Sequence, residues 1–231
     1  GGGSVELALA EKGVWVYGYD TFEPLMWFWR ALLGNPDALA NEADLLRKYK
    51  DYYYGYRGLP KEDFNLIKEE LRNEEKYSLQ NAAKFYALNR SSFSGATLSG
   101  GWSKRASYER FTDSSITRIR EFSEPKLYVA AQHFKHSIPA HPKTFLYLDP
   151  PYLLGKDREN LYGDAGNKHK GFDHAGLVNI LKERDNWILS YNNCPEILKL
   201  YEGYDIIYPD WKYGMSSNKD SKEVLIINKK G

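Results

Sequence analysis

Hydrophobic residues are grouped differently near the ends of the chain and in its middle. Near both ends, short apolar runs typical of buried strands alternate with segments of helical spacing. The runs that predict strands are residues 14–20, 127–131, 144–149, 187–191, 205–209 and 224–228. The segments that predict helices are residues 4–12, 22–33, 174–182 and 194–201. This alternation is typical of an α/β fold in which helices cover both faces of a mainly parallel sheet.

The middle of the chain has a different pattern. Residues 37–88 are mostly helical in character and strongly charged. The clearest helices there are residues 61–71 and 79–88. Residues 89–125 are rich in Ser, Thr, Gly and Arg and show little hydrophobic periodicity. We therefore expect residues 1–35 and 126–231 to form the sheet domain, and residues 36–125 to be inserted into it.

The composition is that of a globular chain with a large core. Of its 231 residues, 42% are hydrophobic, 15% aromatic and 27% charged, a balance that disordered chains lack. The formal net charge of +1 argues against a strong positive field, but the charge is uneven. Residues 37–75 hold ten acidic and seven basic residues, whereas residues 82–120 hold seven basic and two acidic ones. The basic stretch is therefore a candidate surface for nucleic acid.

Cysteine usage and hydropathy limit the class of protein further. Cys194 is the single cysteine, which excludes an intrachain disulfide and a cysteine zinc cluster and makes a cytoplasmic location the default. No apolar run approaches the roughly 20 residues that cross a bilayer, and the first residues lack a signal-peptide pattern. The spacing of His169, Asp173 and His174 is not that of a recognised metal site. We therefore expect neither a membrane nor a metal partner.

The strongest chemical signal is the tetrapeptide Asp149-Pro150-Pro151-Tyr152, which follows an apolar strand. Ligands of open α/β sheets bind at the carboxyl ends of strands. Two prolines make the backbone rigid, so the Asp149 carboxylate and the Pro150 carbonyl can accept both N–H groups of an exocyclic amine. Tyr152 can stack on the ring, and the nitrogen lone pair is then free to attack a methyl group by positioning and electrostatics. An ordinary strand-ending turn is the alternative.

Glycines at the start of the chain are a weaker signal. Gly1, Gly2 and Gly3 precede the first predicted helix, where glycine allows a ligand to approach the backbone closely. Asp20 ends the next predicted strand, where nucleotide-binding folds hold ribose hydroxyls. Terminal glycines are equally typical of a flexible chain end, so this feature alone leaves both interpretations open.

Together these motifs resemble the Dam-type (D12 class) DNA adenine-N6 methyltransferases, and the resemblance covers most of the chain in the order of that family. The segments that carry it are Gly1-Gly2-Gly3-Ser4, Asp20, Asn89-Arg90-Ser91-Ser92-Phe93-Ser94-Gly95, Gln132-His133-Phe134, Asp149-Pro150-Pro151-Tyr152, Phe172-Asp173-His174, Ser190-Tyr191-Asn192-Asn193 and Glu223-Val224-Leu225-Ile226-Ile227-Asn228. The resemblance implies a class I S-adenosylmethionine-dependent methyltransferase (Rossmann-like) sheet with an inserted helical target-recognition subdomain. It also implies methyl transfer from S-adenosylmethionine to N6 of an adenine flipped out of duplex DNA.

The resemblance assigns roles to particular residues. The catalytic residues that it implies are Asp149, Pro150, Pro151 and Tyr152. The residues that it implies at the cofactor are Gly1, Gly2, Gly3, Asp20, His133, Phe134 and Asp149. The residues that it implies at the DNA are Asn89, Arg90, Phe93 and Ser94. Phe93 can enter the base stack or, equally, pack in a local core.

Basic residues of the same insertion are candidates for contacts with DNA phosphates. These residues are Lys104, Arg105, Arg110, Arg118 and Arg120. Any one of them can be part of a solvated surface, but five in a Ser- and Thr-rich insertion favour DNA.

Three departures from the family pattern bear on the cofactor and the target. The Pro-Lys motif and the Phe that precede the glycine loop in the family have no counterpart here, which predicts that this sequence lacks the first strand and part of the cofactor pocket. His133 stands where an acid is usual, and a neutral imidazole accepts a hydrogen bond in one tautomer only. Ser94 replaces the usual Asn, and Leu98 stands near the Arg of GATC-reading relatives. A GATC target is therefore not expected.

Two other functions use the same residues. An RNA adenine-N6 methyltransferase would need the same amine-binding turn, but residues 89–95 favour DNA. A catalytically inactive DNA-binding relative would account for His133 and for the absent N-terminal motif. The prediction that fits most of the residues is an active DNA adenine-N6 methyltransferase.

Overall fold

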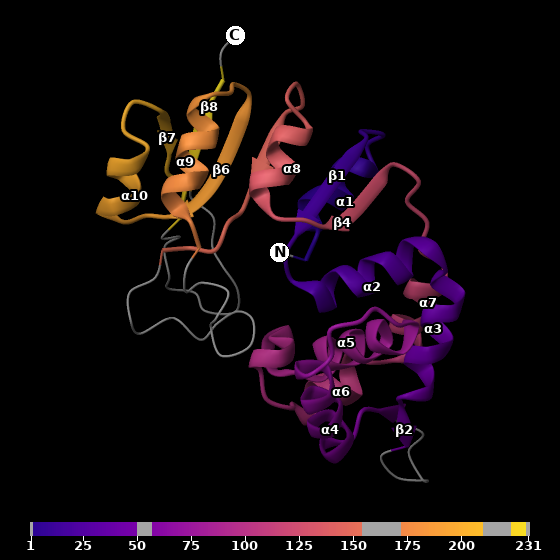
Figure 1. Cartoon of the computed structure of the whole chain (residues 1–231). Coiled ribbons are helices and arrows are strands. Elements are labelled where there is room, and N and C mark those ends of the chain that lie inside the picture. The colour runs from indigo at the N-terminus through magenta and orange to yellow at the C-terminus, as the bar shows by residue number, and fades with distance from the viewer. Residues whose placement is uncertain (1, 50–56, 154–171, 210–222, 230–231) are drawn as a thin grey trace. The chain divides into compact units, whose positions relative to one another are not determined.

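The computed structural model describes residues 2–49, 57–153, 172–209 and 223–229, which divide into two compact units (Figure 1). The first unit holds the described residues up to His133, and the second holds those from Phe134 onwards. Both units combine helices with strands, so the mixed α/β character is confirmed. None of the helices in the described part of the chain has the length and hydrophobicity that a membrane span requires.

The first unit combines many helices with two small sheets. Its helices are α1 (Ser4–Ala10), α2 (Glu23–Gly34), α3 (Pro36–Leu45), α4 (Lys61–Arg72), α5 (Leu79–Ser91), α6 (Lys104–Glu109) and α7 (Asp113–Arg120), and its short 3-10 turns are η1 (Phe93–Gly95) and η2 (Thr97–Ser99). Its strands are β1 (Val16–Asp20), β2 (Lys48–Tyr49), β3 (Arg57–Gly58) and β4 (Leu127–Ala131). Strands β1 and β4 pair in parallel, with Asp20 opposite Ala131, and β2 and β3 pair antiparallel.

Helix α5 is the centre of the helical part of this unit. Helices α2, α3, α4 and α6 pack against it, and its Ala82, Ala83 and Ala87 are fully buried. Small side chains allow neighbouring helices to approach closely, which explains this packing. The buried Arg47 guanidinium, 2.8 Å from Asp44, also pairs with Asp113 at the start of α7. The helical part therefore has its own core and a buried arginine that pairs with two more exposed carboxylates.

The second unit is built on a mixed sheet of strand order β5-β6-β8-β7. Its elements are α8 (Phe134–Ala140), β5 (Leu146–Leu148), α9 (His174–Lys182), β6 (Trp187–Asn192), α10 (Pro195–Leu200), β7 (Asp205–Ile207) and β8 (Glu223–Asn228). Strands β5 and β6 are parallel, and β8 is antiparallel to both β6 and β7. Leu177 and Leu181 of α9 share one core with Trp187 and Leu189 of β6. This core fixes the ends of β5 and β6, where the predicted catalytic residues lie.

The predicted strands and helices near both ends of the chain are confirmed, and α9 has the predicted bounds. Helix α8 was not predicted, because Pro139 interrupts the helical pattern of a short segment. The described strands belong to separate sheets. The continuous Rossmann-like sheet and the division of the chain at residues 36 and 125 therefore stay predictions.

Candidate active site

Strand β5 leads directly into residues 149–152, which we call the DPPY turn. The last paired residue of β5 is Leu148, which lies opposite Leu189 of β6. Pro150 and Pro151 have no N–H group, so the ladder of hydrogen bonds to β6 cannot continue through the turn. The Asp149 side chain is exposed. The turn therefore brings an accessible carboxylate to the carboxyl end of β5.

Tyr152 is held by contacts with β6. Its hydroxyl lies 3.0 Å from the Ser190 hydroxyl, and its ring centroid lies 6.0 Å from that of Tyr191. Burial raises the pKa of the Tyr152 hydroxyl, and the carboxylates of Asp149 and Glu223 raise this pKa further. The side chain is therefore a neutral, fixed ring that can stack on a planar group but cannot act as a base near neutral pH.

The partners of Tyr191 lie on helix α9. Tyr191 is fully buried, and its hydroxyl forms a short hydrogen bond with Nδ1 of His174. Asp173 caps the helix by accepting the Gly176 N–H at 2.7 Å. A Cβ atom at Gly176 would lie 2.2 Å from the Asp173 carboxylate, so the cap requires glycine. His174 thus connects the start of α9 to the strand that supports Tyr152.

His133 and Phe134, the residues predicted at the cofactor adenine, follow strand β4. The His133 side chain is exposed and that of Phe134 is partly buried. The Phe134 ring lies 5.2 Å from the Phe172 ring, and Phe172 contacts the His174 ring at 4.9 Å. Partly buried aromatic rings of this kind suit a flat group such as adenine.

The glycines and Asp20 have the features that a nucleotide-binding segment needs. Gly3 has a φ of 80°, and a Cβ atom there would lie 2.5 Å from the Trp29 ring. At Gly2 an added Cβ would meet nothing within 4 Å, so the backbone is accessible. Asp20 accepts the Phe22 N–H at 2.8 Å through Oδ1, and Oδ2 has no partner among the described residues. This geometry fits a carboxylate that binds ribose hydroxyls. Gly1 lies outside the described residues.

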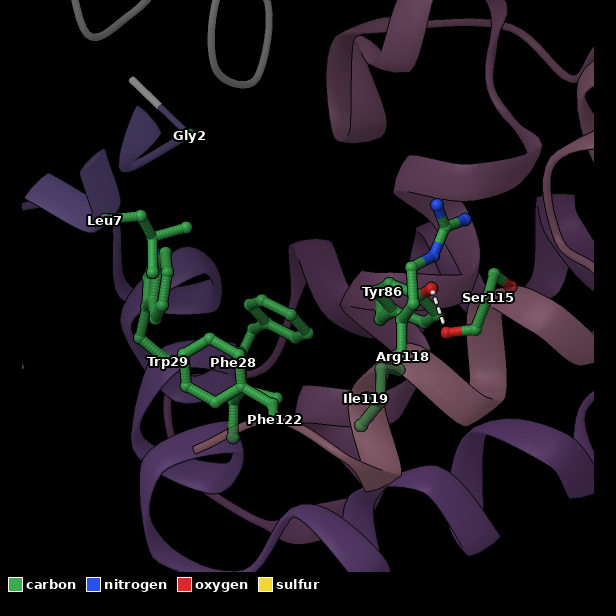
Figure 2. A pocket seen from close by; sticks show the side chains of 10 residues that line it. Gly2, Leu7, Phe28, Trp29, Tyr86, Ser115, Arg118, Ile119 and Phe122 are labelled. Atoms are coloured by element: carbon green, nitrogen blue, oxygen red, sulfur yellow. Dashed lines mark hydrogen bonds between the residues drawn. The ribbon is translucent and has the colours of Figure 1, made fainter. Parts of the chain in front are cut away.

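A cavity of about 240 Å³ opens beside Gly2, between α2, α5 and α7 (Figure 2). Its wall is mainly apolar, and its lining residues are Gly2, Leu7, Phe28, Trp29, Leu32, Tyr86, Ser115, Arg118, Ile119 and Phe122. The Tyr86 hydroxyl donates to the Ser115 carbonyl at 3.1 Å. Sites for drug-sized ligands have volumes of about 300–1,000 Å³. This cavity is therefore too small for a whole S-adenosylmethionine molecule.

Asn89 and Arg90 hold the loop that follows α5. The Asn89 side-chain amide donates to the Gly95 carbonyl at 3.1 Å. The Arg90 guanidinium donates twice to the Arg110 carbonyl, at 3.0 and 2.8 Å. Burial lowers the pKa of Arg90, with smaller contributions from the charges of Arg110 and Arg118. Both side chains therefore shape the predicted DNA-binding loop from within.

Phe93 is an exposed part of this loop. Its side chain is 71% exposed, whereas Leu98 is buried. Ser94 and Gly95 have φ values of 52° and 73°, in the left-handed region that requires support from neighbouring groups. The Arg110 guanidinium provides support by donating to the Ser92 carbonyl. A local core around Phe93, the alternative from the sequence, does not form in this unit.

The remaining predicted DNA-binding cations differ in their partners. Arg105 pairs with Glu109 at 2.8 Å. Arg120 donates to Asn41 at 2.7 Å. Lys104 and Arg118 are exposed and form no hydrogen bond or ion pair with another described residue. These two side chains are therefore available for phosphate contacts without breaking an internal interaction.

A comparison with known families identifies the chain. The model of the D12 class N6 adenine-specific DNA methyltransferases matches residues 1–215 of the 231. The chain belongs to this family. It is thus an adenine-N6 methyltransferase of DNA, and S-adenosylmethionine is its methyl donor. A search of curated proteins found no match.

The family match confirms the predicted activity, cofactor and substrate, and DNA rather than RNA is the substrate of this methyltransferase family. In the described part of the chain, no group of three His, Cys, Asp or Glu side chains could hold a metal ion. No comparison tests the roles of individual residues, so the predicted site residues stay predictions.

The sequence places Ser190-Tyr191-Asn192-Asn193 among the family-like segments, at the sheet edge of the DPPY turn, but it does not show the contacts by which strand β6 supports this turn. Ser190 holds the Tyr152 hydroxyl, and Asn192 binds the backbone of Leu153. A signal for both was present, because polar residues at alternate positions interrupt the apolar pattern at the end of a buried strand. The partner of each polar residue lies 38 or 39 positions away, so the pattern could not identify it.

Proposed function

We propose that the DPPY turn of this methyltransferase holds the N6 amine of the target adenine. The Asp149 carboxylate and the Pro150 carbonyl accept the two N–H groups of the amine. Hydrogen bonding of both N–H groups draws the nitrogen toward tetrahedral geometry and frees its lone pair for attack. The observation that carries this proposal is an exposed Asp149 carboxylate at the end of β5, next to a fixed Tyr152 ring.

Tyr152 stacks on the adenine ring. Its raised pKa keeps the hydroxyl neutral, so no charge opposes the stacked base. The reaction then depends mainly on positioning and electrostatics, and it needs no strong base before attack. Asp149 already accepts one of the amine hydrogens, and it is the group best placed to take up the proton that the nitrogen loses after methylation.

S-adenosylmethionine supplies an electrophilic methyl group when it is bound. Asp20 would hold its ribose hydroxyls through the second carboxylate oxygen, since the first accepts the Phe22 N–H. The backbone at Gly2 would allow close approach of the amino-acid end of the cofactor, because an added Cβ there would meet open space. Gly1 and Gly3 would be part of the same glycine segment. Phe134 would pack against the adenine of the cofactor, with His133 beside it in the sequence.

Phe93 enters the DNA stack and promotes the flipping of the target adenine. Its 71% exposure and the left-handed backbone of the residues after it support this role. Ser94 sets the loop conformation, and Asn89, Arg90 and Arg110 hold it in place through bonds to backbone carbonyls. Lys104 and Arg118 contact phosphates. Arg105 and Arg120 have internal partners, so we assign them no direct contact.

The finer architecture that we propose is a class I, Rossmann-like methyltransferase sheet with an inserted recognition subdomain. Residues 1–35 and 126–231 would form the catalytic domain, and residues 36–125 the insertion. The parallel pairing of β1 with β4 and of β5 with β6 supports this assignment. Because the substrate is DNA, we place the activity in the cytoplasm of a bacterial, archaeal or phage-infected cell.

The test is the substitution Asp149→Ala, with Asp205→Ala as the matched control. Asp205 is an exposed aspartate on β7 of the same unit. Transfer of tritiated methyl groups to unmethylated genomic DNA should fall by at least about 100-fold in Asp149→Ala, the scale of losing a group that acts in the transition state. It should remain unchanged in Asp205→Ala. Near-normal transfer by a folded Asp149→Ala enzyme would disprove the proposed role of the turn.

A further inference from the structure

We propose that Asn192 is a positioning residue for methyl transfer. Its side-chain amide fixes the backbone that leaves the DPPY turn and thereby fixes Tyr152 and the turn itself. This inference rests on the proposed function of the turn. It assigns to Asn192 no contact with the substrate or the cofactor.

The amide of Asn192 binds both backbone groups of one residue. The Leu153 N–H donates to Oδ1 of Asn192 at 3.0 Å, and Nδ2 of Asn192 donates to the Leu153 carbonyl at 2.7 Å. Both side chains are partly buried. Two bonds from one planar amide define the orientation of the bound backbone as well as its distance, which one bond cannot do.

The two prolines leave the DPPY turn with few backbone donors of its own. The pairing of β5 with β6 ends at Leu148 and Leu189, and Pro150 and Pro151 have no N–H to donate. Leu153 is the second residue after the prolines, and its N–H and carbonyl are bound by the Asn192 amide. The side chain therefore replaces the missing ladder at the point where the chain leaves the sheet.

Ser190 and Asn192 act on consecutive residues of the chain. They are two positions apart on β6, so they lie on the same face of the strand. Ser190 holds the hydroxyl of Tyr152, and Asn192 holds the backbone of Leu153. The Tyr152 ring is thus fixed at its hydroxyl end and at its backbone end.

An amide is the side chain that this position requires. An aspartate could accept the Leu153 N–H but could not donate to the Leu153 carbonyl. Asn192 also lies opposite Glu223 in the pairing of β6 with β8. A carboxylate at position 192 would therefore face a like charge directly across the sheet, which is unfavourable.

The test compares Asn192→Ala and Asn192→Asp with the control Asn228→Ala in the full chain. Asn228 also lies in the second unit, opposite Trp187 in the β6–β8 pairing and far from Asn192 along that ladder, and its amide donates to the Arg184 carbonyl at 3.0 Å. Asn192→Ala and Asn228→Ala each lose side chain–backbone hydrogen bonds, so both should lower Tm by about 2–4 °C.

Only the two Asn192 variants should lower the single-turnover rate of methyl transfer, by about 10- to 100-fold, as expected for small misplacements of reacting groups. Their KM for S-adenosylmethionine should stay within about twofold of the wild type, because Asn192 does not touch the cofactor.

The outcomes separate this inference from the proposed function. A normal rate in Asn192→Ala, with Asp149→Ala inactive, would overturn the role of Asn192 and leave the DPPY turn as the site. An equal loss of rate in Asn228→Ala would also overturn it, because the effect would then be general destabilisation. Full activity in Asp149→Ala would overturn the proposed site, and the positioning role with it.

Discussion

At Tyr152 the ring and the hydroxyl have separate roles. The ring is the proposed stacking surface, whereas the hydroxyl binds Ser190 and also interacts with Glu223. Stacking of a base on an aromatic side chain contributes about 1–3 kcal/mol. Tyr152→Ala should therefore lower kcat/KM by about 10- to 100-fold, whereas Tyr152→Phe should stay within about fivefold of the wild type. Steady-state methylation assays measure both. Equal losses in the two variants would mean that the hydroxyl, and not stacking, is what matters.

Removing the hydroxyl of Tyr201 and removing that of Tyr191 should have opposite effects on stability. The Tyr201 hydroxyl is buried and has no hydrogen-bond partner among the described residues, whereas the Tyr191 hydroxyl binds His174. Removing an unsatisfied buried hydroxyl is neutral or stabilising. Tyr201→Phe should therefore keep or raise the free energy of unfolding, by up to about 1 kcal/mol, and Tyr191→Phe should lower it by a similar amount. Urea denaturation measures both values, and a clear loss in Tyr201→Phe would show that its hydroxyl is bound.

At the scale of elements, the basic residues in and next to the loop between α5 and α6 have two different roles. Some shape the loop, and others are available to bind DNA. Arg90 is bonded to the Arg110 carbonyl, whereas Lys104 has no partner among the described residues. Lys104→Gln should reduce the slope of log Kd against log salt by about one, with Tm unchanged. Arg90→Gln should lower Tm because it leaves the Arg110 carbonyl without its donor. Filter binding across salt concentrations and thermal melts measure these effects. A lower Tm in Lys104→Gln, together with a reduced salt slope but an unchanged Tm in Arg90→Gln, would contradict these two roles.

The elements predicted from the sequence are those with strong local signals. Helix α9 and strand β6 have clear apolar periodicity, and their core contacts follow from it. Helices α6 and α7 start from local Ser and Thr caps at Ser103 and Thr112, which periodicity does not detect. The pairing of strands depends on contacts that are distant in the sequence, so the sheets could not be derived from the pattern.

Part of the candidate site could likewise be predicted from the sequence, and part of it could not. Asp149 and Tyr152 could be predicted because the tetrapeptide itself contains the acceptors and the ring. Asn89 and Arg90 could be located, but not their contacts with Gly95 and Arg110, because these depend on the loop conformation. The support by Asn192 depends on a register between residues far apart in the sequence.

At the scale of the whole molecule, burial raises the pKa of Tyr152, Tyr191 and Tyr201. In the unfolded chain these groups titrate near their ordinary value of about 10. The contribution of the three neutral hydroxyls to stability is therefore fully present below about pH 10 and is lost as the pH rises above it. Tm should be insensitive to these groups between pH 7 and 9.5 and should fall steeply at higher pH. Absorbance at 295 nm should show that these tyrosines ionise only as the protein unfolds. Their ionisation in the folded protein near pH 10 would contradict the expected shifts.

The net charge of +1 is a sum over an acidic and a basic stretch of the chain, so it does not describe either stretch. The exposed Lys104 and Arg118 lie in the basic stretch of the chain, whereas the acidic stretch includes Asp44, which is bound to the buried Arg47. A chain of nearly zero net charge can therefore present cations to DNA.

We propose above all that the DPPY turn binds the amine of adenine for methylation. The most direct measurement is nucleoside mass spectrometry of DNA that has been incubated with the enzyme and S-adenosylmethionine carrying a labelled methyl group. We predict labelled N6-methyldeoxyadenosine as the product of the wild type and of Asp205→Ala, and at least about 100-fold less of it from Asp149→Ala. Label in N4-methyldeoxycytidine, or N6-methyldeoxyadenosine formed at the wild-type rate by Asp149→Ala, would contradict this account.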